Sequence, residues 1–202
     1  MKIIMALVVL LFANLGLYAQ AKIAVITGEV FDRQSTYAYL RADKKVYSCK
    51  IVGGRFEFNL PNVEGYKLGT LFLWYDSLSN EKVQQMLKTL DYDSRSIAIE
   101  NLHVVVGEVT QEALIKGGQY NFELDQMFIC LKDKSYSDFF TKYPNSPVSL
   151  TLLRVLINLA KAAPYFRSEL TLKIYFNELG DGLKESAEGK KLWAMIAPMY
   201  KN

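Results

Sequence analysis

The chain has 202 residues, of which 50% are hydrophobic and 22% are charged, a size and composition that suit one large domain or two small ones. The formal net charge of +3 gives no electrostatic reason to expect a nucleic acid or an anionic membrane surface as a partner. Two cysteines are too few for a disulfide scaffold, and without a C-x-x-C spacing the sequence contains no thioredoxin-type redox centre.

The first 19 residues have the order of a secretory signal peptide. Lys2 supplies a positive charge, an apolar run follows from Ile3 to Leu17, and the small Ala19 suits a cleavage site. The run is shorter than the roughly 20 residues that a membrane span needs. We therefore expect export to the periplasm or the extracellular space, with a mature chain that begins at Gln20. The alternative is an uncleaved N-terminal anchor, which is the one case in which we expect membrane association.

The first half of the mature chain has the apolar alternation of β-strands. Strands are predicted over 23–30, 37–40, 46–52, 55–60, 66–75, 97–99, 104–106 and 113–118. A short amphipathic helix is predicted over 79–90. Gly53 and Gly54 stand between two alternating runs, which predicts a type I′ or II′ hairpin. Its register would pair Ile51 with Phe56, Cys49 with Phe58 and Tyr47 with Leu60, all on one buried face.

The second half has the spacing of helices. They are expected over 121–131 and 135–142, from Pro147 onward, after a cap at Ser168 and after a cap at Ser186. The helix that begins near Pro147 is apolar except for one polar stripe, formed by Thr151, Arg154, Asn158 and Lys161. Strands followed by helices predict an α+β fold. We expect a signal peptide over 1–19, an antiparallel β-sandwich-like domain over 20–118 and a helical region over 119–202.

Several short motifs occur in a recognisable order along the mature chain. They are Gly28-Glu-Val30, Tyr39-Leu40, Gly54-Arg-Phe-Glu-Phe58, Ala113-Leu-Ile-Lys-Gly-Gly118 with Asn121, Tyr143-Pro-Asn-Ser146, and Gly189. In this order the chain resembles the N-terminal domain of unknown function that precedes the thioredoxin-like domain in exported bacterial thiol-disulfide oxidoreductases. Those enzymes are of the alkyl-hydroperoxide-reductase and thiol-specific-antioxidant type. The chain departs from them because it stops at Asn202, about where the catalytic domain would begin, so none of its residues matches the catalytic motif.

Three hypotheses about function follow from these patterns. We expect a non-catalytic, exported binding or accessory module, and the resemblance implies a protein or a thioredoxin-like domain as its partner. The alternative is the N-terminal part of a thiol-disulfide oxidoreductase whose catalytic domain is missing or separately encoded. A third hypothesis is a membrane-tethered protein that keeps its N-terminal helix. No set of residues stands out as catalytic, cofactor-binding or metal-ligating, so we expect no cofactor.

Two pairs of residues are weak site candidates. Cys49 and Cys130 could form a disulfide after export, although two buried thiols are the favoured interpretation. Phe72 and Trp74 share one face of a strand that is apolar on both faces. That face is either covered by helices, which we favour, or exposed as a binding surface.

The remaining candidates read better as structural residues. His103 is the only histidine, so a histidine pair or a histidine-rich metal site is excluded. Asp91 and Asp93 are spaced as turn residues rather than as an acid–base pair. Four residues partly match the pattern of a calcium-binding loop: Asn177, Asp181, Gly182 and Glu188. Leu179, however, occupies a position in that loop that needs an oxygen ligand, so a helix stop at 180–182 is the preferred interpretation.

Overall fold

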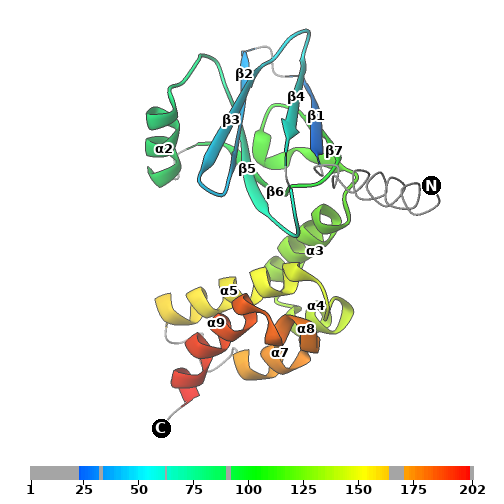
Figure 1. Ribbon diagram of the computed structural model, residues 1–202, viewed down its shortest axis with the longest axis vertical. Helices are drawn as coiled ribbons and strands as arrows, with labels where there is room; N and C mark the ends of the chain where they lie inside the picture. Colours follow the sequence, from blue (N-terminus) through cyan, green and yellow to red (C-terminus); the bar gives the residue numbers. More distant parts are fainter. Residues whose placement is uncertain (1–22, 32–33, 62, 90–91, 164–170, 201–202) are drawn as a thin grey trace, which may run out of the picture.

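The computed structural model describes residues 23–31, 34–61, 63–89, 92–163 and 171–200. The predicted signal peptide and the predicted cap at Ser168 lie outside these residues. The strands lie at one end of the molecule and most of the helices at the other, with α3 between them, so the α+β prediction is confirmed (Figure 1). Among the described residues, no helix is both long enough and apolar enough to pass through a membrane.

In the part of the chain that the structure describes, eight strands form two sheets. They are β1 (Ala24–Val30), β2 (Tyr37–Ala42), β3 (Lys45–Lys50), β4 (Arg55–Leu60), β5 (Leu68–Trp74), β6 (Ser94–Ala98), β7 (Leu102–Val106) and β8 (Leu114–Lys116). The first sheet has the order β4-β1-β7-β8 and the second sheet the order β3-β2-β5-β6. Every pairing is antiparallel except that of β1 with β7, which is parallel. The expected antiparallel β-sandwich therefore contains one parallel pair among its described strands.

The Gly-Gly segment forms the tight turn that the sequence predicts. Gly53 and Gly54 have φ of +57° and +72°, a conformation that L side chains rarely adopt and that a type I′ turn requires. The N–H of Val52 donates to the carbonyl of Arg55 at 2.9 Å, and the reverse bond is 3.0 Å. The chain passes from the second sheet to the first at this turn.

The strand register that we predicted for this hairpin is wrong. Cys49 in β3 lies opposite Ala38 of β2, and Phe58 in β4 lies opposite Ile26 of β1. The predicted face is correct, since the six alternating side chains all pack into the space between the sheets. Alternation specifies which face of a strand is buried but not which strand it pairs with. When β3 and β4 belong to different sheets of a sandwich, they bury the same side chains as they would in a hairpin.

The sandwich core lies between the two sheets and contains side chains from both. It is built mainly by Ile26, Leu40, Phe56, Phe58, Leu71, Ile97 and Val104. The outer face of the second sheet carries a smaller cluster in which Tyr39 and Phe72 stack at 5.1 Å and pack with Val83 of α2 (Asn80–Thr89). Helix α2 thus covers the aromatic part of this outer face (Figure 1).

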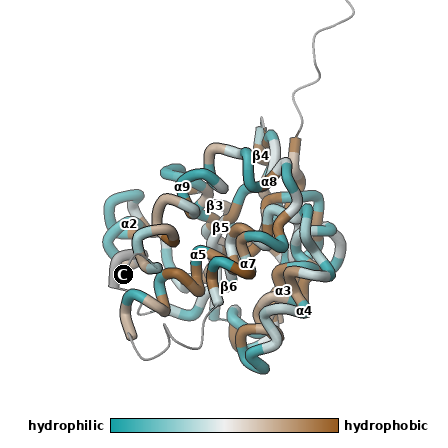
Figure 2. The backbone as a smooth tube through the Cα atoms, turned by 90° about the horizontal axis from the view of Figure 1, so that it is seen from below, coloured by the Kyte–Doolittle hydropathy of each residue, from teal (hydrophilic) through white to brown (hydrophobic). Residues whose placement is uncertain are grey.

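The second half of the chain forms its own apolar core around α5. The helices are α3 (Gln119–Asp133), α4 (Tyr136–Lys142), α5 (Pro147–Ala162), α7 (Leu172–Glu178), α8 (Asp181–Glu185) and α9 (Ala187–Ile196), with short 3₁₀ segments η1 (Thr110–Glu112) and η2 (Ala197–Tyr200). Seen from the helical end, these helices contain both hydrophobic and hydrophilic residues along their length (Figure 2). The predicted cap at Ser186 accepts the N–H of Gly189, and Ser146, just before the predicted start at Pro147, accepts the N–H of Val148. Helix α8 was not expected, because 180–182 was interpreted as a turn.

Gly28 in β1 offers a test of the sandwich packing. A Cβ at this position would lie 2.1 Å from the ring of Phe56, so this buried ring must leave its place in the core if a larger residue is introduced. We expect Gly28→Ala to lower the free energy of unfolding by about 1–3 kcal/mol, measured by urea denaturation. Gly107→Ala is the matched control, since its added Cβ would meet nothing within 4 Å. Equal stability of the two variants would contradict this packing.

Candidate functional site

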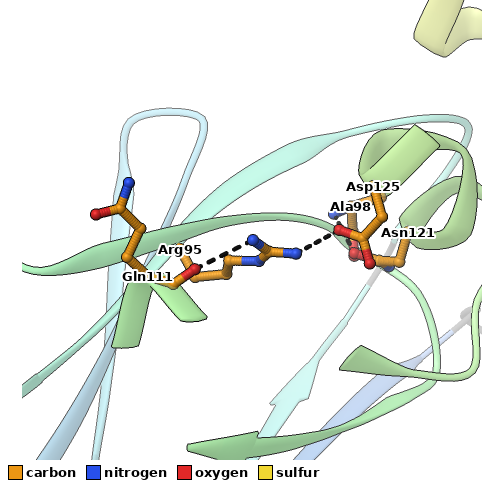
Figure 3. A network of polar contacts seen from close by, with 5 residues as sticks. All are labelled: Arg95, Ala98, Gln111, Asn121 and Asp125. Carbon is orange, nitrogen blue, oxygen red and sulfur yellow. Dashed lines mark hydrogen bonds and ion pairs between the residues drawn. The ribbon is translucent and has the colours of Figure 1, made fainter. Parts of the chain in front are cut away.

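One buried amide joins the strand half of the molecule to the helical half. Asn121 in α3 is 2% exposed. Its side-chain oxygen accepts the backbone N–H of Ala98 at 2.9 Å, and its side-chain nitrogen donates to the carbonyl of Ala98 at 2.9 Å (Figure 3). Ala98 belongs to β6, which is an edge strand of the second sheet, so the amide occupies the place of a further strand.

A carboxylate next to this amide holds the start of α3. One oxygen of Glu100 accepts the N–H groups of Tyr120 at 3.0 Å and of Asn121 at 3.2 Å, which are free donors of the first helical turn. Gly118 precedes the helix with φ of +77°, and a Cβ there would lie 2.5 Å from the Glu100 carboxylate. This close approach requires glycine, so the Gly-Gly exit from β8 sets the direction of α3.

Two further polar contacts fix α3 against its neighbours. The Arg95 guanidinium of β6 donates to the carbonyl of Gln111 at 3.1 Å and pairs with Asp125 of α3 (Figure 3). Glu123, which is 3% exposed, accepts the hydroxyl of Ser146, the residue that caps α5. Helix α3 therefore fixes α5 relative to the second sheet.

A cleft of about 850 Å³ lies between the second sheet and α5. Its sheet wall contains Arg41, Thr70 and Ser96, which come from β2, β5 and β6. Arg41 is in register with Thr70, and Thr70 is in register with Ser96, so the three side chains form one row across the outer face. The row lies beside the aromatic cluster that α2 covers.

The helix wall of the cleft is the polar stripe predicted for α5. Thr151, Arg154 and Asn158 line it together with Val155, at the spacing of one helical face. The hydroxyl of Tyr66 lies 3.2 Å from that of Thr151 and connects this wall to the segment before β5. Burial raises the pKa of Tyr66 to about 12, so this hydroxyl stays neutral at physiological pH and acts as a hydrogen-bonding group.

The charges around the cleft are unevenly compensated. Lys67 pairs with Asp43 at 3.7 Å, and Arg154 pairs with Glu188 of α9. Arg41 is half-buried and makes no ion pair or hydrogen bond through its side chain to any residue that the structure describes. The cleft therefore has one guanidinium without a compensating carboxylate.

The structure separates the two cysteines. Cys49 lies half-buried in β3 beside the sandwich core, and Cys130 is buried in the helical core, and both are free thiols. The candidate disulfide is thus wrong, because the two residues belong to different cores. Burial raises the pKa of both thiols, that of Cys130 to about 11.

The two residues of the candidate binding surface are largely covered. Phe72 has no exposed surface and stacks on Tyr39, so it cannot contribute to a surface in this structure. Trp74 is half-buried and stacks on Tyr75 at 5.1 Å. The second face of β5 is therefore covered, as favoured, by a cluster that includes Tyr39 of β2 and Val83 of α2.

The other sequence candidates have structural contacts. The Nδ1 atom of His103 lies 2.9 Å from the hydroxyl oxygen of Thr27. Asp93 accepts the N–H groups of Thr110 and Gln111 and so holds η1, whereas Asp91 lies outside the described residues. The residues of the calcium-like loop point to other partners, as Asp181 pairs with Lys184 and Glu188 with Arg154. Within the described ranges no three His, Cys, Asp or Glu side chains gather as metal ligands.

Sequence reasoning found one wall of the cleft and missed the other. The helix wall follows from the polar stripe of α5, which was predicted. Arg41, Thr70 and Ser96 are far apart in sequence and become neighbours only through the pairing of three strands. Arg41 lies one residue beyond the strand predicted over 37–40, so the sequence pattern did not place it on the sheet.

The Asn121 amide predicts a measurable contribution to stability. Asn121→Ala would leave both backbone groups of Ala98 buried without partners, at a cost of about 1–3 kcal/mol for each. We expect urea denaturation to show a loss of at least about 2 kcal/mol. The control is Asn59→Ala, an exposed position whose amide donates to Glu57, where a change within about 0.5 kcal/mol is expected. An unchanged Asn121→Ala variant would show that the amide does not hold the joint.

The raised thiol pKa values predict slow alkylation and a pH-dependent stability. In the native protein at pH 8, iodoacetamide should modify both cysteines much more slowly than in the denatured protein, as followed by intact mass. The thiolate is disfavoured in the fold, so the contribution of Cys130 to stability is present below pH 9.0 and is lost as the pH rises towards about 11. A mass gain of two protons on reduction would contradict the assignment of free thiols.

No protein-family model, no curated protein and no solved structure matches this chain. The resemblance to the accessory domain of thiol-disulfide oxidoreductases thus stays a prediction.

Proposed function

We propose that this chain is a non-catalytic, exported binding module that holds its ligand in the cleft between the second sheet and α5. The observation that carries the proposal is the convergence of two polar walls on one hollow of about 850 Å³. Ligand sites have volumes of this order and combine apolar lining with a few well-placed polar groups. Here the polar groups come from three strands and one helix, and the apolar ones include Leu68, Leu150 and Val155.

The state of the polar groups near the cleft favours binding over catalysis. Catalytic acids and bases need a pKa close to the working pH and access to the substrate. Glu100 and Glu123 instead accept hydrogen bonds from the helix starts that they hold. Tyr66 stays neutral because its pKa lies at about 12. Glu100 and Glu123 thus have structural roles, and the neutral Tyr66 hydroxyl can form hydrogen bonds with a ligand.

The motifs behind the family resemblance support an accessory role. Gly28 and Gly118 stand where another backbone or side chain approaches closely, and at Gly189 a Cβ would lie 2.0 Å from the carbonyl of Leu183. Asn121 and Ser146 join elements to one another. These motifs therefore specify a scaffold, as expected of an N-terminal accessory domain. A partner protein, such as a thioredoxin-like domain, would then supply any chemistry.

The proposed function can be tested by filling the cleft. Ser96 is exposed on the sheet wall, so Ser96→Trp should occupy the hollow with little effect on folding. The probes are four eight-carbon compounds with different head groups, namely octanoate, octylamine, octanol and octyl phosphate, titrated against the ¹⁵N-labelled protein and followed by NMR shifts. At least one probe should shift amides of β5, β6 and α5, and Ser96→Trp should abolish that binding.

The matched control for this experiment is Ser48→Trp. Ser48 is also an exposed serine on the second sheet, but it lies on β3 and does not line the cleft. This variant should bind the probe like the unaltered protein. Absence of binding by every probe, or binding that Ser96→Trp leaves intact, would overturn the assignment of the cleft as the ligand site.

A further inference from the structure

We propose that the cleft selects a carboxylate attached to an apolar body, and that Arg41 binds the carboxylate. This inference rests on the proposed function, because it names the ligand class for the same cleft. It starts from the charges that line the cleft. Asp43 pairs with Lys67 and Glu188 pairs with Arg154, which leaves the Arg41 guanidinium as the one positive group there without an acidic partner among the described residues.

The position of Arg41 suits binding of an anion. Its side chain stands on the outer face of β2, half-buried, and faces α5 across the cleft. A half-buried guanidinium interacts with an anion more strongly than one in bulk water, because the effective dielectric constant is lower. Its N–H groups form a planar fork that matches the two oxygens of a carboxylate.

The neighbours of Arg41 extend this anion site. Thr70 lies next to Arg41 in register, and Ser96 lies next to Thr70, so two hydroxyl donors continue the row away from the guanidinium. A hydroxyl can donate to a carboxylate oxygen or to a polar atom near it. The three residues therefore offer hydrogen bonds along one line across the sheet wall.

The charge of the cleft selects one negative charge over two. One uncompensated guanidinium neutralises a monoanion. Asp43 and Glu188 also line the cleft and would repel a second negative charge, which disfavours phosphate monoesters. A cationic head group would meet Arg41 and be repelled. These electrostatics point to a carboxylate rather than a phosphate or an amine.

The apolar lining accounts for the rest of the ligand. Leu68 of β5, Leu150 and Val155 of α5 and Leu183 of α8 border the same hollow. A hydrocarbon chain or an apolar side chain could bury its surface against them, at roughly 25 cal/mol per Å². A small free acid and the C-terminal residue of a peptide share this chemistry, and the experiment below separates them.

The test compares ligands that differ in one group. Octanoate, octanol, octylamine and octyl phosphate are titrated by NMR against the full chain, and octanoate should bind best. The second arm compares a short peptide ending in leucine as the free acid with the same peptide as the amide. Stronger binding of the acid peptide than of octanoate would identify a chain terminus as the source of the carboxylate. Stronger binding of octanoate than of the acid peptide would identify a small acid.

Arg41→Gln tests the role of the guanidinium. This variant should weaken octanoate binding about tenfold or more, since a hydrogen bond to a charged group is lost. Arg41→Lys should fall between it and the unaltered protein, because the charge remains but the fork does not. Arg55→Gln is the control, an exposed arginine of the first sheet that pairs with Glu29, and it should bind octanoate normally. The unfolding midpoint of each variant confirms that it folds.

The outcomes separate this inference from the proposed function. If octanol, octylamine or octyl phosphate binds in the cleft and octanoate does not, the carboxylate assignment fails and the binding module stands. If octanoate binds equally well to Arg41→Gln and to the unaltered protein, the role of Arg41 fails. If no probe binds at all, both the binding-module proposal and the carboxylate proposal are wrong.

Discussion

The pair of hydrogen bonds between the Asn121 amide and the backbone of Ala98 fixes the helical half of the molecule against the strand half. An edge strand has backbone N–H and C=O groups with no neighbouring strand to pair with. Strand β6 is such an edge strand, and its free side faces the start of α3. The amide satisfies one donor and one acceptor of that edge. Glu100 holds the same helix start through two further backbone groups. Helix α3, and through Glu123 and Ser146 also α5, thereby take a fixed place beside the second sheet.

That placement divides the outer face of the second sheet into two parts. Tyr39 and Arg41 lie on the same face of β2, two residues apart, but meet different surroundings. Tyr39 stacks on Phe72 under α2, in a closed apolar cluster. Arg41 lies beyond the reach of α2, where the sheet faces the polar stripe of α5. The apolar end of this outer face is covered by α2, and its polar end forms one wall of the cleft.

Local patterns predicted the elements well, and the pairing of the strands less well. The helix start at Pro147, the cap at Ser186 and the Gly53-Gly54 turn depend on neighbouring residues, so the sequence contains their whole cause. The partners of β3 and β4 depend on strands that are distant in the chain, and alternation fits either arrangement. The row of Arg41, Thr70 and Ser96 arises only from such distant pairings, which is why the sheet wall of the cleft was not predicted.

The two arginines that line the cleft differ in what holds them, and this difference bears on recognition. Arg154 forms an ion pair with Glu188 in which the side chains are 52% and 33% exposed, and such a pair contributes at most about 1 kcal/mol. Arg154 can therefore exchange its partner for a ligand at small cost. Arg41 has no acidic partner to give up among the described residues, so an incoming anion displaces water there but no carboxylate of the protein.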